Sequence, residues 1–290
     1  MVVSKRAADR RDDILALIRD RNRVYVTELS EKFQVSEVTI RKDLQELEQR
    51  GVAKRVHGGA INIYNTGIEP TLKELEQTNT DLKLAIAAKA FEYISDQDVL
   101  FLDASTTTRC LIPLICKHPE KKLTIITSSI LTAADLSACE HVSLIMLGGN
   151  VRSSLCCVDG IYTTSFIQEF HVDKVFFGAN GFDVTEGITI TNISASLVKR
   201  AMIENAVQVF LLADSSKYNC VTLSRVCPIS RIDFLVTDDR LTADDVVAIE
   251  QQGVEVIIAS ANTRRGNVSP SLPPGADLVK LPTEDPEQIA

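Results

Sequence analysis

The chain has 290 residues, of which 45% are hydrophobic and 24% are charged. This length accommodates one small and one larger domain with buried cores, and the composition is ordinary for a soluble protein. No apolar run is long enough to cross a membrane, and the charged start does not resemble a secretory signal, so we expect a cytoplasmic protein without a membrane partner.

Charge is divided unevenly along the chain. Residues 1–59 carry 13 Lys and Arg against 10 Asp and Glu, whereas the remainder carries 18 against 29. The net charge of −8 hides this division. The asymmetry indicates that the N-terminal part meets a polyanion, with double-stranded DNA as the expected partner.

The N-terminal part predicts three helices. Apolar residues at helical spacing indicate a first helix from about Arg6 to Asp20. Thr27 is a candidate cap for a short second helix over residues 28–33. After a tight turn, Ser36 is expected to cap a third helix that ends before Gly51.

A hairpin follows the third helix. The segment VAKRV alternates in polarity, and His57-Gly58-Gly59 is typical of a turn. Residues 1–61 therefore predict a winged helix-turn-helix domain. In such domains the N-terminal side chains of the second helix of the motif reach base edges in the major groove, where Arg41 suits guanine and Lys42 suits phosphate. The predicted DNA-binding residues are Ser36, Glu37, Thr39, Arg41, Lys42, Gln45, Lys54, Arg55 and His57.

A different pattern follows a polar stretch. Residues 62–80 predict a linker, and residues 81–94 a helix. Residues 81–260 then alternate apolar runs with helical segments, which is typical of an α/β domain with a mostly parallel sheet. Residues 261–290 predict a mobile tail. The expected buried strands are 99–103, 123–128, 142–149, 174–180, 209–214, 233–238 and 254–260.

Small, hydroxylated or Gly-rich residues follow five of these strands. Ligands in open parallel sheets lie outside the carboxyl ends of the strands, so these runs predict a site for a small polyhydroxylated anion. The Ser/Thr run before a helix suits phosphate, Arg152 and Lys217 supply positive charge, and Asp103 and Asp214 suit sugar hydroxyls or orient Lys217. The predicted effector-binding residues are Asp103, Ser105, Thr106, Thr107, Ser128, Gly148, Gly149, Arg152, Asn180, Glu186, Asp214 and Lys217.

The sequence resembles the DeoR family of bacterial sugar-operon repressors from about Arg10 to Ser260. The segments that carry the resemblance are RRDDILALI, VSEVTIRKDLQELEQRGVAKRVHGGAI, FLDASTTT, MLGGNVR, FFGANGFDVTEGIT, LVKRAMIENA and LLADSSKY. The resemblance implies a sensor domain with the fold of sugar-phosphate isomerases and a homo-oligomer, either dimer or tetramer. It also places a phosphate cradle on Ser105, Thr106, Thr107 and Gly149, near Lys217. The chain departs from the family pattern at two positions. The family usually has Gly in place of Ser105 and often has Asn in place of Ser128.

We therefore expect a transcriptional repressor of a carbohydrate or polyol operon, which a phosphorylated sugar releases from its operator. One alternative is an isomerase-like enzyme with a DNA-binding appendage, in which Asp103, Asp214, Lys217 or Glu186 would do acid–base work. The seven cysteines show no metal-ligand spacing and are expected to be reduced, mostly buried thiols, with no metal or cofactor. The adjacent Cys156 and Cys157 leave a redox-responsive regulator as a further alternative.

Overall fold

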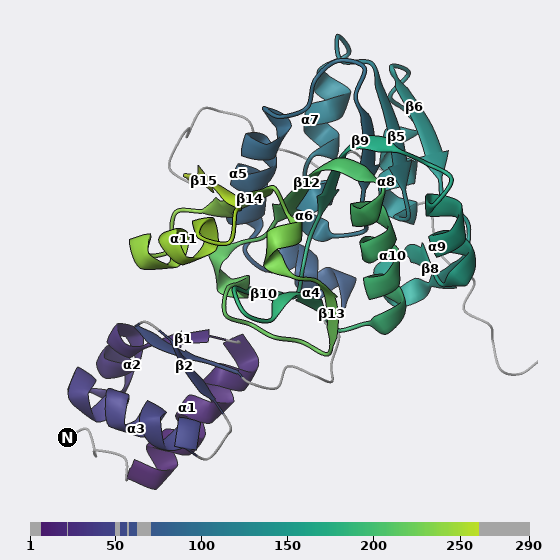
Figure 1. Cartoon of the computed structure of the whole chain (residues 1–290). Helices are drawn as coiled ribbons and strands as arrows, with labels where there is room; N and C mark the ends of the chain where they lie inside the picture. The colour runs from purple at the N-terminus through teal and green to yellow at the C-terminus, as the bar shows by residue number, and fades with distance from the viewer. Residues whose placement is uncertain (1–6, 22, 50–52, 57, 63–70, 261–290) are drawn as a thin grey trace, which may run out of the picture.

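The computed structural model describes residues 7–21, 23–49, 53–56, 58–62 and 71–260. It contains a small helical N-terminal domain and a larger α/β domain, which confirms the predicted fold class (Figure 1). His57 and the predicted tail lie outside the described residues.

Three helices and a small sheet make up the N-terminal domain. The sheet is antiparallel, with strand order β1-β3-β2, so the predicted hairpin is confirmed and gains a third strand. The core is apolar, with Ile14, Ile18, Ile40 and Leu47 fully buried. The elements are α1 (Ala7–Arg21), β1 (Arg23–Tyr25), α2 (Val26–Phe33), α3 (Glu37–Gln49), β2 (Lys54–Val56) and β3 (Gly59–Ile61).

Local signals fix the two helix ends that shape the motif. Gln34 ends α2 in the left-handed region at φ 53°, and the Thr39 N–H donates to Ser36 Oγ over 3.2 Å at the start of α3. The prediction that Thr27 caps the second helix is wrong. Strand β1 runs directly into α2, so Tyr25 takes the N-cap position without a side-chain bond, and Thr27 lies inside the helix.

A parallel sheet of seven strands organises the larger domain, in the order β15-β14-β12-β9-β4-β5-β6. Each of the seven apolar runs forms one of these strands. Alternate residues of the central strands face opposite layers of helices, with Phe101 and Phe177 in one core cluster and Leu102 and Phe176 in the other. The strands are β4 (Val99–Leu102), β5 (Leu123–Thr127), β6 (Val142–Met146), β9 (Val172–Phe177), β12 (Ala206–Leu212), β14 (Phe234–Asp238) and β15 (Glu255–Ala259).

Helices and 3-10 turns connect these strands. Figure 1 shows α5 on one side of the sheet, and α9 and α10 together at the right. The helices are α5 (Thr80–Phe91), α6 (Thr106–Arg109), α7 (Ile112–Lys117), α8 (Ile130–Leu136), α9 (Ile161–Ile167), α10 (Ile193–Glu204) and α11 (Ala243–Glu250), and the turns are η1 (Ser153–Leu155), η2 (Ser215–Lys217) and η3 (Ile229–Arg231).

Short elements lie outside the predicted pattern. Two antiparallel units insert between the long strands, one made of β7 (Asn150–Arg152) and β8 (Cys157–Asp159), the other of β10 (Gly181–Asp183), β11 (Gly187–Ile190) and β13 (Ser224–Cys227). Within the predicted linker, Thr71 and Glu74 form a capping box that starts α4 (Leu72–Gln77). Strands of three or four residues carry too little periodicity to be recognised in the sequence.

A disulfide corrects the expectation of reduced cysteines. Cys116 at the end of α7 and Cys139 after α8 are bonded, with their Cα atoms 5.5 Å apart. They are 23 residues apart in the chain, so only the packing of the two helices brings them together. Among the described residues, none of the helices combines the length and apolar content needed to cross a membrane.

Candidate functional site

Helix α3 separates an apolar inner face from a charged outer face. Leu44 and Leu47 are buried, whereas Glu37, Arg41 and Lys42 are exposed. Arg41 Nη2 lies 2.9 Å from Glu37 Oε2, one helical turn away. Because both side chains are exposed, this pair contributes about 0.3–0.5 kcal/mol, so little free energy is lost when Arg41 leaves Glu37.

A buried ion pair holds α3 from below. Asp43 lies on the inner face of α3, and Arg10 Nε of α1 donates to Asp43 Oδ2 over 2.6 Å. Arg11 Nη1 lies 3.9 Å from the other carboxylate oxygen. This contact fixes the position of α3 on α1 and was not predicted. The sequence signal for this contact is Asp43, an aspartate at a position of the helical repeat where apolar residues are expected.

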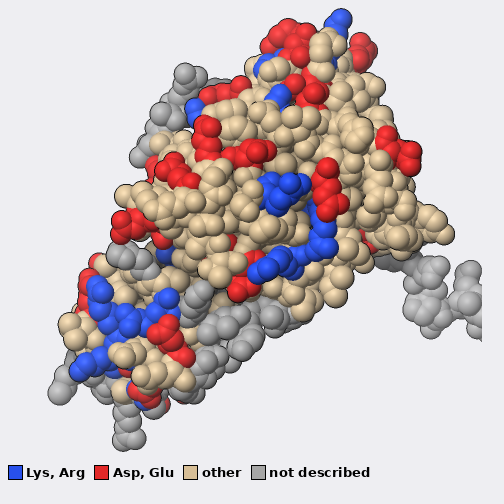
Figure 2. Space-filling model, in the orientation of Figure 1, with Lys and Arg blue, Asp and Glu red and all other residues tan. Residues whose placement is uncertain are grey.

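The wing lies beside α3. The Arg55 N–H donates to Glu48 Oε1 over 2.9 Å, and Arg41, Arg55 and Gly58 line a hollow between helix and wing. A Cβ at Gly59 would lie 1.9 Å from the Val24 carbonyl oxygen, so the hairpin requires glycine there. Figure 2 shows Lys and Arg side chains gathered on this small domain, at the lower left. Of the predicted wing residues, Arg55 is exposed, the side chain of Lys54 is not described, and His57 lies outside the described residues.

In the larger domain, the predicted ligand edge has a switch point between β4 and β9. From β4 the chain proceeds outward through β5 and β6, whereas β9, β12, β14 and β15 follow in the other direction. Open α/β sheets bind ligands where the strand order reverses in this way. At this point the Gly178 N–H, after β9, donates to Asp103 Oδ2, after β4, over 3.0 Å.

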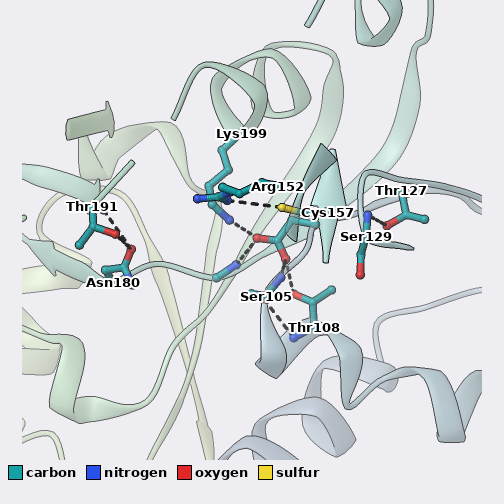
Figure 3. A network of polar contacts seen from close by, with 11 residues as sticks. Ser105, Thr108, Thr127, Ser129, Arg152, Cys157, Asn180, Thr191 and Lys199 are labelled. Atoms are coloured by element: carbon teal, nitrogen blue, oxygen red, sulfur yellow. Dashed lines mark hydrogen bonds and ion pairs between the residues drawn. The ribbon is translucent and has the colours of Figure 1, made fainter. Parts of the chain in front are cut away.

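Asp103 is the centre of a buried hydrogen-bond network (Figure 3). The Ser105 N–H and the Thr108 hydroxyl donate to Oδ1 over 3.0 and 2.8 Å, and Lys199 of α10 pairs with Oδ2. Burial opposes ionisation of this carboxyl, but the Lys199 charge and the donors from Gly178 and Ser105 outweigh burial and hold its pKa below the usual range.

Lys199 was not among the predicted residues. It stands on α10, and the first six residues of that helix carry no charge, so a lysine directly after them is the one signal that the sequence offered. Figure 3 shows the Lys199 and Arg152 side chains in the same network, and the charges of both act on the Cys157 thiol. Arg152 lies at the end of β7. Its Nε atom is 3.3 Å from Asp159 Oδ2, and its Nη2 atom donates to Cys157 Sγ over 3.4 Å. Each cation is thus matched by a carboxylate, so the site offers directed donors and no excess charge.

Ser105 serves as the N-cap of α6. Its Oγ accepts from the Thr108 N–H over 3.2 Å, and its Cβ would lie 2.6 Å from a Cβ at Gly178, which explains the glycine after β9. The Thr106 and Thr107 amides belong to the first turn of α6, where N–H groups have no partner within the helix. They face the same end of the sheet as Asp103.

Residues after β5 and β6 complete this edge. Ser128 is buried, and its carbonyl accepts from the Val158 N–H over 2.8 Å, which ties β5 to the hairpin that carries Arg152. Gly148 and Gly149 are exposed, and a Cβ at Gly149 would lie 2.0 Å from Thr163 Oγ1. Glycine at 149 is therefore required by close packing against α9.

Three predicted residues, Glu186, Asn180 and Asp214, have partners outside the Asp103 network. Glu186 pairs with Arg225 of β13 over 2.8 Å, and Asn180 Oδ1 accepts from the Thr191 N–H over 3.1 Å. Asp214 accepts from Asn79 Nδ2 over 3.0 Å and caps η2, the turn that contains Lys217. Lys217 follows β12, and β9 separates β12 from β4, the strand before Asp103. The lysine that pairs with Asp103 is therefore Lys199, in the position expected for Lys217.

Helix α4 is bound to this end of the sheet by three contacts. Arg109 of α6 pairs with Glu76 over 2.8 Å and with Asp135 of α8 over 2.8 Å. The buried Lys83 donates to the Leu75 carbonyl, and burial lowers the pKa of its ammonium. With the Asn79–Asp214 bond, these contacts fasten α4, which stands between the two domains in the chain, to α5, to α6 and to the turn after β12.

Comparison with protein families decides the relationship. Residues 10–66 match the family model described as the DeoR-like helix-turn-helix domain, and residues 78–239 match the DeoR C terminal sensor domain. The chain belongs to the DeoR family. It is therefore a DNA-binding transcriptional regulator with a sensor domain for a sugar-related effector.

This chain matches curated relatives over nearly their whole length. The uncharacterized HTH-type transcriptional regulator YulB of Bacillus subtilis is 35% identical over 257 residues, covering 89% of this chain and 98% of that protein. The putative aga operon transcriptional repressor of Escherichia coli O157:H7 is 32% identical over 253 residues, covering 87% and 93%. The glycerol-3-phosphate regulon repressor of Escherichia coli K12 is 31% identical over 229 residues, covering 79% and 90%.

These relatives are named as regulators, so the alternative of an enzyme with a DNA-binding appendage is not favoured. The match with the structure of ribose 5-phosphate isomerase A from Methanocaldococcus jannaschii covers 49% of this chain and 55% of that chain, with 21% identity and a TM-score of 0.37. A match at this level supports no conclusion about function.

Proposed function

We propose that this DeoR-family regulator represses a carbohydrate or polyol operon and leaves its operator when a phosphorylated sugar or polyol binds at the switch point of the sheet. The observation that carries the proposal is the buried Asp103–Lys199 pair at the switch point between β4 and β9, with Arg152 in the same network of polar contacts (Figure 3). The relatives named as repressors of the aga operon and the glycerol-3-phosphate regulon support the class of effector.

Directed donors recognise the effector. Lys199 has three N–H groups and uses one on Asp103, so the others serve a ligand oxygen together with Arg152. The first-turn amides of Thr106 and Thr107 suit the phosphate oxygens. Asp103 accepts four hydrogen bonds already, so its role is to position Lys199 and the loop after β9.

The signal passes from the site to α4. Ser105 and Thr106 begin α6, and Arg109 at the end of α6 holds Glu76 of α4. Displacement of α6 by the ligand moves Arg109 and changes how α4 presents the DNA-binding domain. Such coupling is worth about 1–3 kcal/mol and equals the effector's differential affinity for the two states.

The regulator acts as a homo-oligomer in this proposal. A single recognition helix reads one half-site, and two copies at fixed spacing read a palindromic operator. An effector that alters the spacing of the two copies removes their geometric match to the DNA.

The test is fluorescence anisotropy of the full chain on labelled DNA from directly upstream of its own gene. A panel of sugar and polyol phosphates is titrated in, with the unphosphorylated parents as controls. Release by a phosphorylated compound and not by its parent is the expected result. Salt-sensitive DNA binding that no compound of the panel disturbs would contradict the effector class, and turnover of a sugar phosphate would contradict the absence of catalysis.

A further inference from the structure

An apolar face covers one end of the sensor domain. Of the twelve large apolar side chains that are exposed in the described part of the chain, six lie on β7, α9 and α10. Helix α9 packs against both α10 and β8, and β8 pairs with β7, so these elements form one surface. The members of this α9–α10 face are Val151, Ile161, Tyr162, Phe166, Ile193 and Leu197.

The exposure of these side chains is large. Tyr162 exposes 74% of its surface, Ile161 71% and Val151 64%. Single exposed apolar residues are ordinary, whereas a contiguous patch marks an interaction site. With side chains of this size, the face offers on the order of 600 Å², most of the roughly 800 Å² that each partner of a standard interface buries.

The face also carries no net charge, whereas the chain after residue 59 is acidic. Helix α9 and the first six residues of α10 contain no charged residue, and Arg152 and Asp159 of the hairpin pair with each other. The surface that lies over α9 in Figure 1 is mainly tan in Figure 2. After residue 59 the chain carries 29 acidic against 18 basic residues, so two copies repel each other least where this face meets itself.

We propose that the α9–α10 face is the surface through which two copies of this chain associate about a two-fold axis. In an isologous contact each face meets its own copy, which an uncharged surface rich in aromatic and branched side chains permits. Glu169 and Arg200, both exposed, flank the face and supply part of a polar rim. The proposal deepens the homo-oligomer of the proposed function and rests on it.

The test compares the full chain with two variants by sedimentation equilibrium over a range of protein concentrations. Tyr162→Glu and Leu197→Glu each place two carboxylates near the axis and are expected to weaken self-association by about 30-fold or more. Val247→Glu on α11 is the matched control, because Val247 is 50% exposed outside the face, and it is expected to associate as the unmodified chain does.

The outcomes separate the two claims. Far-UV circular dichroism and thermal unfolding establish whether the variants fold. If a charged variant does not fold, Tyr162→Ala replaces it, and this variant is expected to weaken association less. An unmodified chain that is monomeric at every concentration would overturn both the homo-oligomer and the face. An oligomer that persists unchanged in folded Tyr162→Glu and Leu197→Glu would overturn the face alone.

Discussion

The two domains each contain a buried pair of opposite charges, and the pairs do different work. In the N-terminal domain Arg10 and Asp43 lie on the inner side of α3, and the outer face of α3, which we predict to bind DNA, stays exposed. In the sensor domain Asp103 and Lys199 lie at the edge of the sheet where we propose that the effector binds. A DNA reader needs a rigid support behind an exposed helix, whereas a sensor needs a charge that a ligand can reach.

The largest effect is expected for Lys199→Met, which removes the cation of the sensor-domain pair. The change leaves Asp103 as an uncompensated buried charge and lowers the free energy of unfolding at pH 7 by about 3–5 kcal/mol. Lys174→Met is the matched control, because Lys174 forms a similarly buried pair with Asp98. Urea unfolding measures both.

The pH dependence of that deficit has a definite sign. In the unmodified chain the folded pKa of Asp103 is lowered, so its contribution is present at neutral pH and is lost only as acid brings the pH through that low value. Without Lys199, burial raises the folded pKa, and the variant regains stability as the pH falls. The deficit therefore narrows from pH 7 towards pH 4, and a constant deficit would refute this assignment of the pair.

The second change is Arg10→Met in the DNA-binding domain. We expect about 2–3 kcal/mol of lost stability, below the range for a fully uncompensated charge, because Arg11 remains 3.9 Å from Asp43. Differential scanning calorimetry measures the loss. DNA affinity falls to the same extent on operator and random sequences because the whole helix loses its support. A change in sequence preference would show that Arg10 does more than support α3.

The third change, Arg41→Ala, tests the outer face of α3. It is expected to weaken operator binding by about 1–3 kcal/mol and random DNA by less, if Arg41 contacts guanine. Lys42→Ala is the neighbouring control. It is expected to lower the affinity for operator and random DNA equally and to reduce the slope of log affinity against log salt concentration by about 1. Equal losses for Arg41→Ala would make it a phosphate contact.

The fourth comparison uses the two serine caps. Ser36→Ala at the start of α3 is expected to cost about 1 kcal/mol in thermal unfolding, whereas Ser105→Gly at the start of α6 costs a few tenths. The Ser105→Gly variant is expected to keep its effector response, because the Ser105 hydroxyl is used within α6. Loss of that response would instead identify the hydroxyl as a ligand.

A small effect on stability is also expected for Glu76→Gln, which removes the exposed pair with Arg109. It costs less than about 1 kcal/mol of stability. Operator affinity without effector stays unchanged, and the effector concentration needed for release rises. Unaltered release in the anisotropy titration would remove α4 from the path between the domains.

The sequence predicted the DNA-binding domain better than the sensor site for a physical reason. Spacing along one helix determines which face carries Arg41 and which carries Leu44, so local order suffices. The partner of Asp103 comes from residue 199, and only the strand order β9-β4 brings the two together. The same limit explains why Lys217 was expected in the place of Lys199, and why the Cys116–Cys139 disulfide was missed. The predicted domain boundaries stay predictions, although α4 begins inside the predicted linker.

The redox alternative has weak physical support. Burial raises the pKa of the Cys157 thiol, which lowers the fraction of reactive thiolate. A role for Cys156 and Cys157 stays a prediction, to be tested by the response of DNA binding to oxidant in a chain with both changed to serine.

The most direct test of the sensor site is the effector concentration that releases half of the bound DNA, measured for Lys199→Met and Lys174→Met at a temperature where both are folded. Lys174→Met is expected to release DNA at the concentration found for the unmodified chain. Lys199→Met, in contrast, should hold its operator throughout the titration. Release of both variants at the same concentration would show that the Asp103–Lys199 pair stabilises the fold and does not contact the effector.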